Sequence, residues 1–124
     1  MNAAIAHLKS ILENNKIKVV LEDDSEQLSP TAFKKRAILF VESVDTEQHS
    51  THFTDSVSIR AEIQHDKSSE ALELVSTVRA QATGQLSSSI VGVVFTGMSV
   101  GENPYLENVK SYRMNFKIIT ITKR

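Results

Sequence analysis

The residues best suited to metal chemistry lie in one polar segment near the middle of the chain. His49 and His52 are three positions apart, and Asp45, Glu47 and Asp55 flank them. Imidazole nitrogens and carboxylate oxygens of this kind can hold a divalent metal ion. A structural zinc site, however, needs converging ligands with fixed outer partners, whereas a polar segment of this composition is commonly just solvated. We therefore expect no metal centre and no cofactor, and we keep a weak divalent site near His49 and His52 as the alternative.

Two short motifs invite a catalytic or nucleotide-binding interpretation, and neither meets its requirements. Ser87, Ser88 and Ser89 supply hydroxyls, but no glycine-flanked nucleophile elbow surrounds them and no adjacent base is identifiable. Segment 97–101 has a glycine at each end, but it lacks the Lys-Ser/Thr step and has the wrong spacing for a nucleotide fingerprint. We interpret the first motif as a loop and the second as a turn in a long β connection. The sequence therefore predicts no enzyme.

Three consecutive cations, Lys34, Lys35 and Arg36, stand where a β-patterned segment begins. They could meet phosphate or an acidic protein surface. Cations at such a position more often protect a strand edge against aggregation or are simply solvated. We favour the protective role, or a contact at the rim of a partner protein.

Composition limits the class of protein further. A chain of 124 residues fits one domain, here residues 1–124, with a sizeable core. The absence of cysteine excludes disulfides, thiolate metal sites and cysteine nucleophiles. A formal net charge of -1 lacks the basic excess of a protein that binds nucleic acid by neutralising phosphates. No apolar run is long enough to span a bilayer, and the first residues lack the pattern of a signal peptide, so we expect a soluble protein that is not exported.

Helical spacing of apolar residues predicts two helices, at residues 2–14 and 68–83. His65 and Asp66 stand where a strand ends and the second helix must be capped, so capping is the role we expect of them. His7 falls on the polar side of the first helix.

The sequence has five β-patterned segments, three before the second helix and two after it. They are residues 17–21, 36–44, 57–64, 90–96 and 112–118, the last followed by a Thr-Ile-Thr ending. The third has the clearest alternation, with one buried and one wet face, and the apolar run 37–41 predicts a strand that is central or covered on both sides. The sequence thus predicts an α+β fold of order α-β-β-β-α-β-β, with a mixed or antiparallel sheet of about five strands packed with two helices.

Two connections are longer than a tight hairpin requires, at residues 45–54 and 97–109. The first either projects as an arm or lets its flanking strands extend beyond the core, and such an extension needs a partner. Connections of this length could reach a neighbouring subunit. The candidate subunit or partner contacts are Lys34, Lys35, Arg36, Glu47, His49, His52, Met98, Asn103 and Tyr105.

In its size, its element order, its helical segment 70–79 (EALELVSTVR) and its closing strand 112–118 (YRMNFKI), the chain resembles the tail terminator proteins of long-tailed bacteriophages. The resemblance implies a ring, usually hexameric, that caps the tail tube, ends its polymerisation and presents the surface on which the head docks. The implied partners are further copies of the chain, the tail tube protein and a head-completion protein, with no membrane and no sequence-specific nucleic acid. The implied location is the cytoplasm of a bacterial host, or the virion tail.

Three other interpretations stay open. One is a different head-to-tail connector or tail-completion subunit, and another is an enzyme whose polar groups gather only in three dimensions. The third is a small α+β module that binds a ligand or nucleic acid. The first five elements follow the order of a double-stranded-RNA-binding domain, but residues 66–70, where the second helix opens, carry one lysine and two acids, which argues against phosphate contacts.

Overall fold

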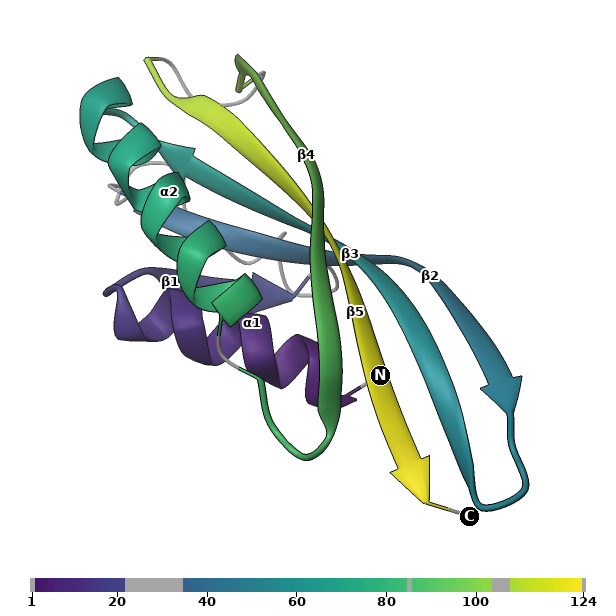
Figure 1. The fold of residues 1–124 in the computed structure, drawn as a ribbon. Coiled ribbons are helices and arrows are strands. Elements are labelled where there is room, and N and C mark those ends of the chain that lie inside the picture. Colours follow the sequence, from purple (N-terminus) through teal and green to yellow (C-terminus); the bar gives the residue numbers. More distant parts are fainter. Residues whose placement is uncertain (1, 22–34, 85, 104–107, 124) are drawn as a thin grey trace.

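The computed structural model describes residues 2–21, 35–84, 86–103 and 108–123 (Figure 1). Its elements are α1 (Asn2–Asn14), β1 (Lys18–Leu21), β2 (Lys35–Gln48), β3 (His52–His65), α2 (Ser68–Gly84), β4 (Ile90–Glu102) and β5 (Lys110–Lys123). The strands form one five-stranded sheet. The predicted α+β class and the predicted order of elements are therefore confirmed.

The order of the strands across the sheet is β1-β2-β3-β5-β4. β1 runs parallel to β2, and each of the other neighbouring pairs is antiparallel, so the sheet is mixed. β5 lies between β3 and β4 although it follows both in the chain. The described sheet therefore ends in a short strand on one side and in the long strand β4 on the other.

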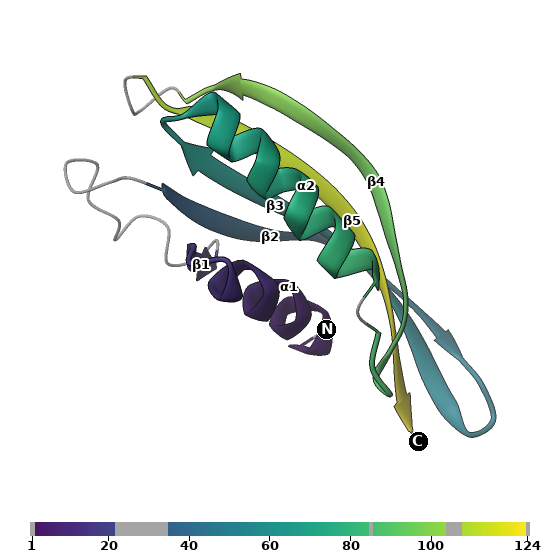
Figure 2. The same cartoon turned by 60° about the vertical axis from the view of Figure 1, so that its left-hand side comes forward.

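Both helices pack on the same face of the sheet, and Figure 2 shows the sheet curving around them. α1 lies on the side of β1, and α2 lies over β5 and β4. The core between helices and sheet is formed by buried apolar side chains of both helices and of β2 to β5, with the partly buried Val19 of β1 packed against it. It includes Leu8, Ile11, Leu12, Leu39, Val57, Ile59, Ile63, Val75, Val78, Tyr112, Met114, Phe116 and Ile118.

The two helices begin and end close to the predicted positions because their buried residues recur every three or four positions. After α1 the chain turns at Lys16, whose φ of 63° is left-handed, and the N–H of Ile17 donates to the carbonyl of Leu12 at 3.1 Å. This geometry closes the end of the helix. The prediction for His7 was incomplete, because its half-buried ring donates from Nε2 to the carbonyl of Ala82 on α2, at 2.9 Å.

Alternation in β3 is confirmed, since Val57, Ile59, Ala61 and Ile63 are all fully buried between intermediate positions. Residues 37–39 of β2 are buried in succession, which confirms that this stretch is covered on both sides.

Residues 45–54 extend the two strands beyond the core. β2 continues to Gln48 and β3 begins at His52, which leaves only residues 49–51 for the turn of the hairpin. The predicted connection is therefore a strand extension with a tight turn, the second of the two possibilities.

Our interpretation of residues 97–109 as a turn-rich connection is wrong for its first part. β4 runs on to Glu102, and Gly97 lies in an irregularity of the β4–β5 ladder with a φ of 155°. Gly101 stays in register with β5, where an added Cβ would lie 2.9 Å from Nη1 of Arg113. The two glycines thus serve a bulge and a close side-chain approach, and neither ends the strand.

Candidate assembly surface

The hairpin of β2 and β3 projects past the helices as an arm, together with the end of β5 (Figures 1 and 2). We define the arm as residues 42–56. Every β2 residue from Glu42 to Gln48 is exposed, although the same strand is buried at residues 37–39. Because the helices do not cover this part of β2, both of its faces and its outer edge are accessible to a binding partner.

The tip of the arm is held by short contacts. The backbone N–H of His49 donates to the carbonyl of His52 at 2.8 Å, and the two imidazole rings stack with centroids 4.4 Å apart. Thr46 donates its hydroxyl to Oδ1 of Asp55 at 2.6 Å across the hairpin. Nε2 of His49 lies 3.9 Å from Oε1 of Glu47. These contacts order the tip without a ligand.

The metal alternative at the tip gains no support. Among the residues that the structure describes, no three His, Asp or Glu side chains are placed to hold a metal ion together. The two imidazoles face each other as a stack, and a stacked pair does not direct two nitrogen lone pairs at one point.

The outer edge of β4 is also open, because β4 pairs with β5 alone among the described strands. It is 13 residues long and carries one charged side chain, that of Glu102. Four of its apolar side chains are exposed: Val91 at 52%, Val94 at 51%, Met98 at 40% and Val100 at 47%. Strands at the edge of a sheet usually carry lysine, proline or other charges that prevent pairing with another chain. β4 has no lysine or proline, and its protection is limited to Glu102 and two irregularities of its ladder with β5, so the exposed apolar side chains indicate a partnered edge.

The face of the sheet opposite the helices carries a charged network. The guanidinium carbon of Arg60 lies 4.3 Å from the centre of the Phe40 ring. Oε2 of Glu62, a largely buried carboxylate, lies 3.9 Å from Nε of Arg60 and 3.7 Å from Nε of Arg113. One carboxylate thus faces two guanidinium groups on neighbouring strands, and this part of the face keeps an excess of positive charge.

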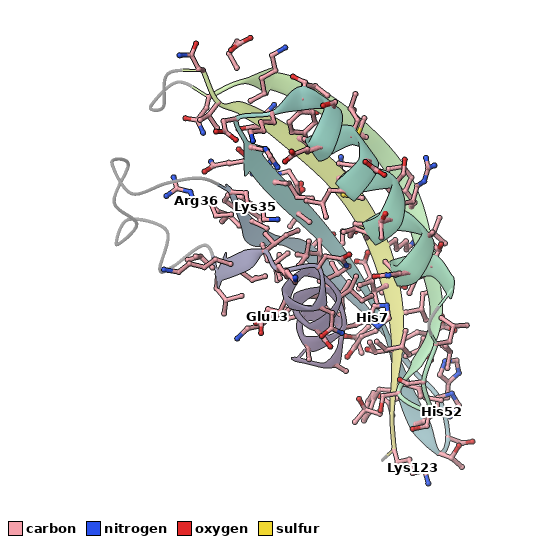
Figure 3. The ribbon with its side chains drawn as sticks, turned by 90° about the vertical axis from the view of Figure 1, so that its left-hand side faces the viewer. His7, Glu13, Lys35, Arg36, His52 and Lys123 are labelled. Atoms are coloured by element: carbon pink, nitrogen blue, oxygen red, sulfur yellow. The ribbon has the colours of Figure 1, made fainter. Side chains whose placement is uncertain are left out.

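Lys35 and Arg36 begin β2 at the end of the sheet opposite His52 and Lys123 (Figure 3). Nε of Arg36 donates to Oε1 of Gln64 on β3, and burial lowers the pKa of the Arg36 guanidinium from its ordinary value. Because Arg36 is paired in register with Lys18 of β1, the edge needs no guard at that position. The contact at the rim of a partner stays a prediction.

A depression of about 270 Å³ lies beside Lys35, between the end of β3 and the first turn of α2. His65 lines it and is only 5% exposed. Its Nδ1 accepts the backbone N–H of Lys67 at 2.9 Å, and its Nε2 lies 3.7 Å from Oε2 of Glu70. The capping role that we expected of His65 accounts for this arrangement.

The predicted contact residues thus divide among separate parts of the molecule. Glu47, His49 and His52 lie on the arm, Met98 lies on β4, and Asn103 follows β4, where its N–H donates to the carbonyl of Val109 at 3.1 Å. Lys35 and Arg36 lie at the far end of β2. Lys34 and Tyr105 are outside the described residues.

Sequence reasoning missed the exposed valines of β4. Residues 90–96 are an apolar run, and such a run predicts a covered strand whichever edge of the sheet it occupies. The available signal was the absence of lysine and proline from a long β segment, together with the apolar alternation of Met98 and Val100 after Gly97.

Within the described residues, no helix is long and apolar enough to cross a membrane. Comparison with family models and with curated proteins found no match to this sequence.

Proposed function

We propose that this chain is a structural subunit of a bacteriophage or prophage tail, which assembles with copies of itself into a closed, hexameric ring. The ring caps the tail tube, ends its polymerisation and provides the surface on which the head docks. The resemblance of element order and segment character supplies the specific role. The open outer edge of β4, with its exposed apolar side chains, is the observation that supports assembly best.

A ring needs a head-to-tail interface, in which two different surfaces of one subunit meet on successive copies. The molecule has two such surfaces on opposite sides of the sheet: the exposed apolar edge of β4, and the exposed half of β2 in the arm. The chemistry of the described residues is also that of a binding surface. Its cations and acids are spread over strands and helix ends, and His65, which lines the depression beside Lys35, is engaged in a capping hydrogen bond.

The mass of the protein in solution tests the proposal. Light scattering across a concentration series should give a discrete oligomer, and negative-stain electron microscopy of the same sample should show closed rings. If the chain is monomeric in isolation, tail tube protein should still capture it in a pull-down, because some rings form only on their target.

Stable dimers at every concentration would contradict the proposal, because a two-fold pair consumes the surface that successive ring subunits must share. A monomer that tail tube protein does not capture would contradict it as well. Closed rings of another stoichiometry would replace the terminator with a different connector subunit.

A further inference from the structure

Besides the outer edge of the four-residue strand β1, two strand edges of this sheet have no neighbour among the described residues. One is the edge of β4. The other is the outer edge of β2 beyond Leu39, because β1 pairs with β2 only from Arg36 to Leu39. We call this second edge, residues 40–48, the arm edge.

Backbone hydrogen bonds at the ends of the two ladders show which groups point outward. The N–H of His49 donates to His52, and the N–H of Asn103 donates to Val109, so each is a directly bonded pair. Bonded and non-bonded pairs alternate along an antiparallel ladder. Counting back by this rule, the backbone N–H and C=O groups of Val44 point out from the arm edge, and those of Met98 and Val100 point out from β4.

The side chains of these outward residues also agree in face and in chemistry. Val44 is opposite Val57 of the core, and Met98 and Val100 are opposite core residues of β5, so all three side chains lie on the helix side of the sheet. Each is exposed, at 40%, 40% and 47% respectively. Joining the two edges with the helices on the same side would therefore place apolar side chains against one another.

Charge favours a contact between the arm edge and β4 over a contact between two arm edges. The arm edge carries Glu42, Asp45 and Glu47 and no cation, whereas β5, beside β4, carries Lys110, Arg113, Lys117 and Lys123 and no acid. Because Gly101 has no side chain, the Arg113 guanidinium reaches across it, within 2.9 Å of the place of a Cβ, towards the free edge. Two copies joined through the arm edge would bring the acids together, whereas the arm edge of one copy beside β4 of the next would place them near the Arg113 guanidinium; β4 itself carries one charge, that of Glu102.

We infer that the arm edge of one copy adds to β4 of the next copy as an antiparallel strand, so that the sheets of successive subunits are continuous. The antiparallel orientation follows from the sheet. Within one copy, β2 and β4 run in opposite directions, and the rotation that relates successive copies in a ring leaves the direction of each strand relative to the ring axis unchanged. Backbone bonds supply affinity in this mode of strand addition, and the flanking side chains supply specificity. The inference rests on the proposed ring and names the contact that closes it.

Introduced cysteines test the contact directly, because the chain has none of its own. The variants Val44→Cys/Val100→Cys and Val44→Cys/Met98→Cys place one thiol on each edge, and side chains opposite one another on paired strands are close enough for a disulfide or a short bismaleimide. At least one double variant should give covalent multimers up to the ring size on a denaturing gel. The matched control, Val44→Cys/Lys9→Cys, places the second thiol on the exposed face of α1 and should give none.

The outcomes separate this inference from the proposed function. Rings in electron micrographs without cross-links in either double variant would overturn the inference and leave the ring intact. Covalent dimers of the single variant Val100→Cys would also overturn it, in favour of a two-fold β4 contact. Absence of any oligomer, in the untreated protein and on tail tubes, would overturn both.

A further variant tests the contact even if the cysteine variants fail to fold. Val100→Lys adds the charge that protects ordinary strand edges. Its circular dichroism spectrum and unfolding midpoint should match those of the parent chain at a concentration where the parent is not assembled, while the oligomer is lost at higher concentration. A Val100→Lys protein that still forms rings of the parent mass would overturn the inference.

Discussion

The two halves of β2 share one strand and have opposite environments. Ala37 and Leu39 pack in the core beneath the helices and Ile38 is buried on the opposite face, whereas residues 42–48 in the arm are all exposed. The backbone ladder to β3 continues through both halves, with one irregularity between Val41 and Ser43. Burial in this molecule is therefore decided by the layer that covers a strand, and a strand can continue where no core supports it.

The largest expected difference between the two regions is the effect of losing an aromatic ring. Phe116 is 1% exposed beneath α2, and Phe116→Ala should lower the free energy of unfolding by about 3–5 kcal/mol. Phe53, half-buried in the arm, should lose only about 1 kcal/mol in Phe53→Ala. Urea denaturation of both variants, at a concentration where the parent is not assembled, measures the two values. Equal losses would show that the arm is packed as firmly as the core.

A smaller effect should distinguish the two glycines of β4. Gly97 has a φ of 155°, which strains any residue with a Cβ, so Gly97→Ala should cost about 1–3 kcal/mol. In Gly101→Ala the new Cβ meets only the far end of the Arg113 side chain, which can move, and the cost should stay below about 1 kcal/mol. Thermal unfolding of the pair tests this order. The reverse order would mean that Arg113 is fixed in place more firmly than the bulge.

The hydrogen bond between the helices should contribute about 1 kcal/mol. His7→Ala removes the donor to the Ala82 carbonyl and should lower the free energy of unfolding by about 0.5–1.5 kcal/mol. The control is Lys9→Ala on the same helix, which breaks an exposed pair with Glu13 at 3.8 Å and should cost a few tenths of a kcal/mol, in the range of about 0.2–0.5. Indistinguishable losses would show that the His7 contact adds nothing to the docking of the helices.

The smallest effect should come from the tip of the arm. The double variant His49→Ala/His52→Ala removes the stacked rings and should change the free energy of unfolding by less than about 0.5 kcal/mol, because neither ring supports the core. Addition of zinc, or of a chelator, should leave the unfolding midpoint of the parent unchanged. A midpoint that rises with zinc in the parent and not in the double variant would restore the metal alternative.

Periodicity located the elements that touch the core. The helical spacing in α1, and the alternation of Val57, Ile59, Ala61 and Ile63 in β3, each report one covered face, and the structure confirms both. The same logic fails in the arm, because residues 42–48 are covered on neither face and so carry no apolar alternation. At Gly97, a glycine in a bulge has the same sequence signature as a glycine in a turn.

The candidate site was harder to predict because it depends on neighbours in the sheet. Nothing in the pattern of Val94, Met98 or Val100 states that β4 is an edge, since β5 could have joined either side of it. The bond from His7 to the carbonyl of Ala82 joins residues 75 positions apart, and a single histidine on a helix gives no information about so distant an acceptor.

The position of β5 has a consequence for the synthesis of the chain. β5 leaves the ribosome after the other four strands of this sheet, yet it separates β3 from β4 and supplies much of the core. Until it emerges, β4 has no partner on either side, and the pairing that completes the sheet must wait for distant segments to meet. A chain truncated before Lys110 would lose two ladders at once. Chaperones and proteases could then recognise an unfinished subunit before it reached any other copy.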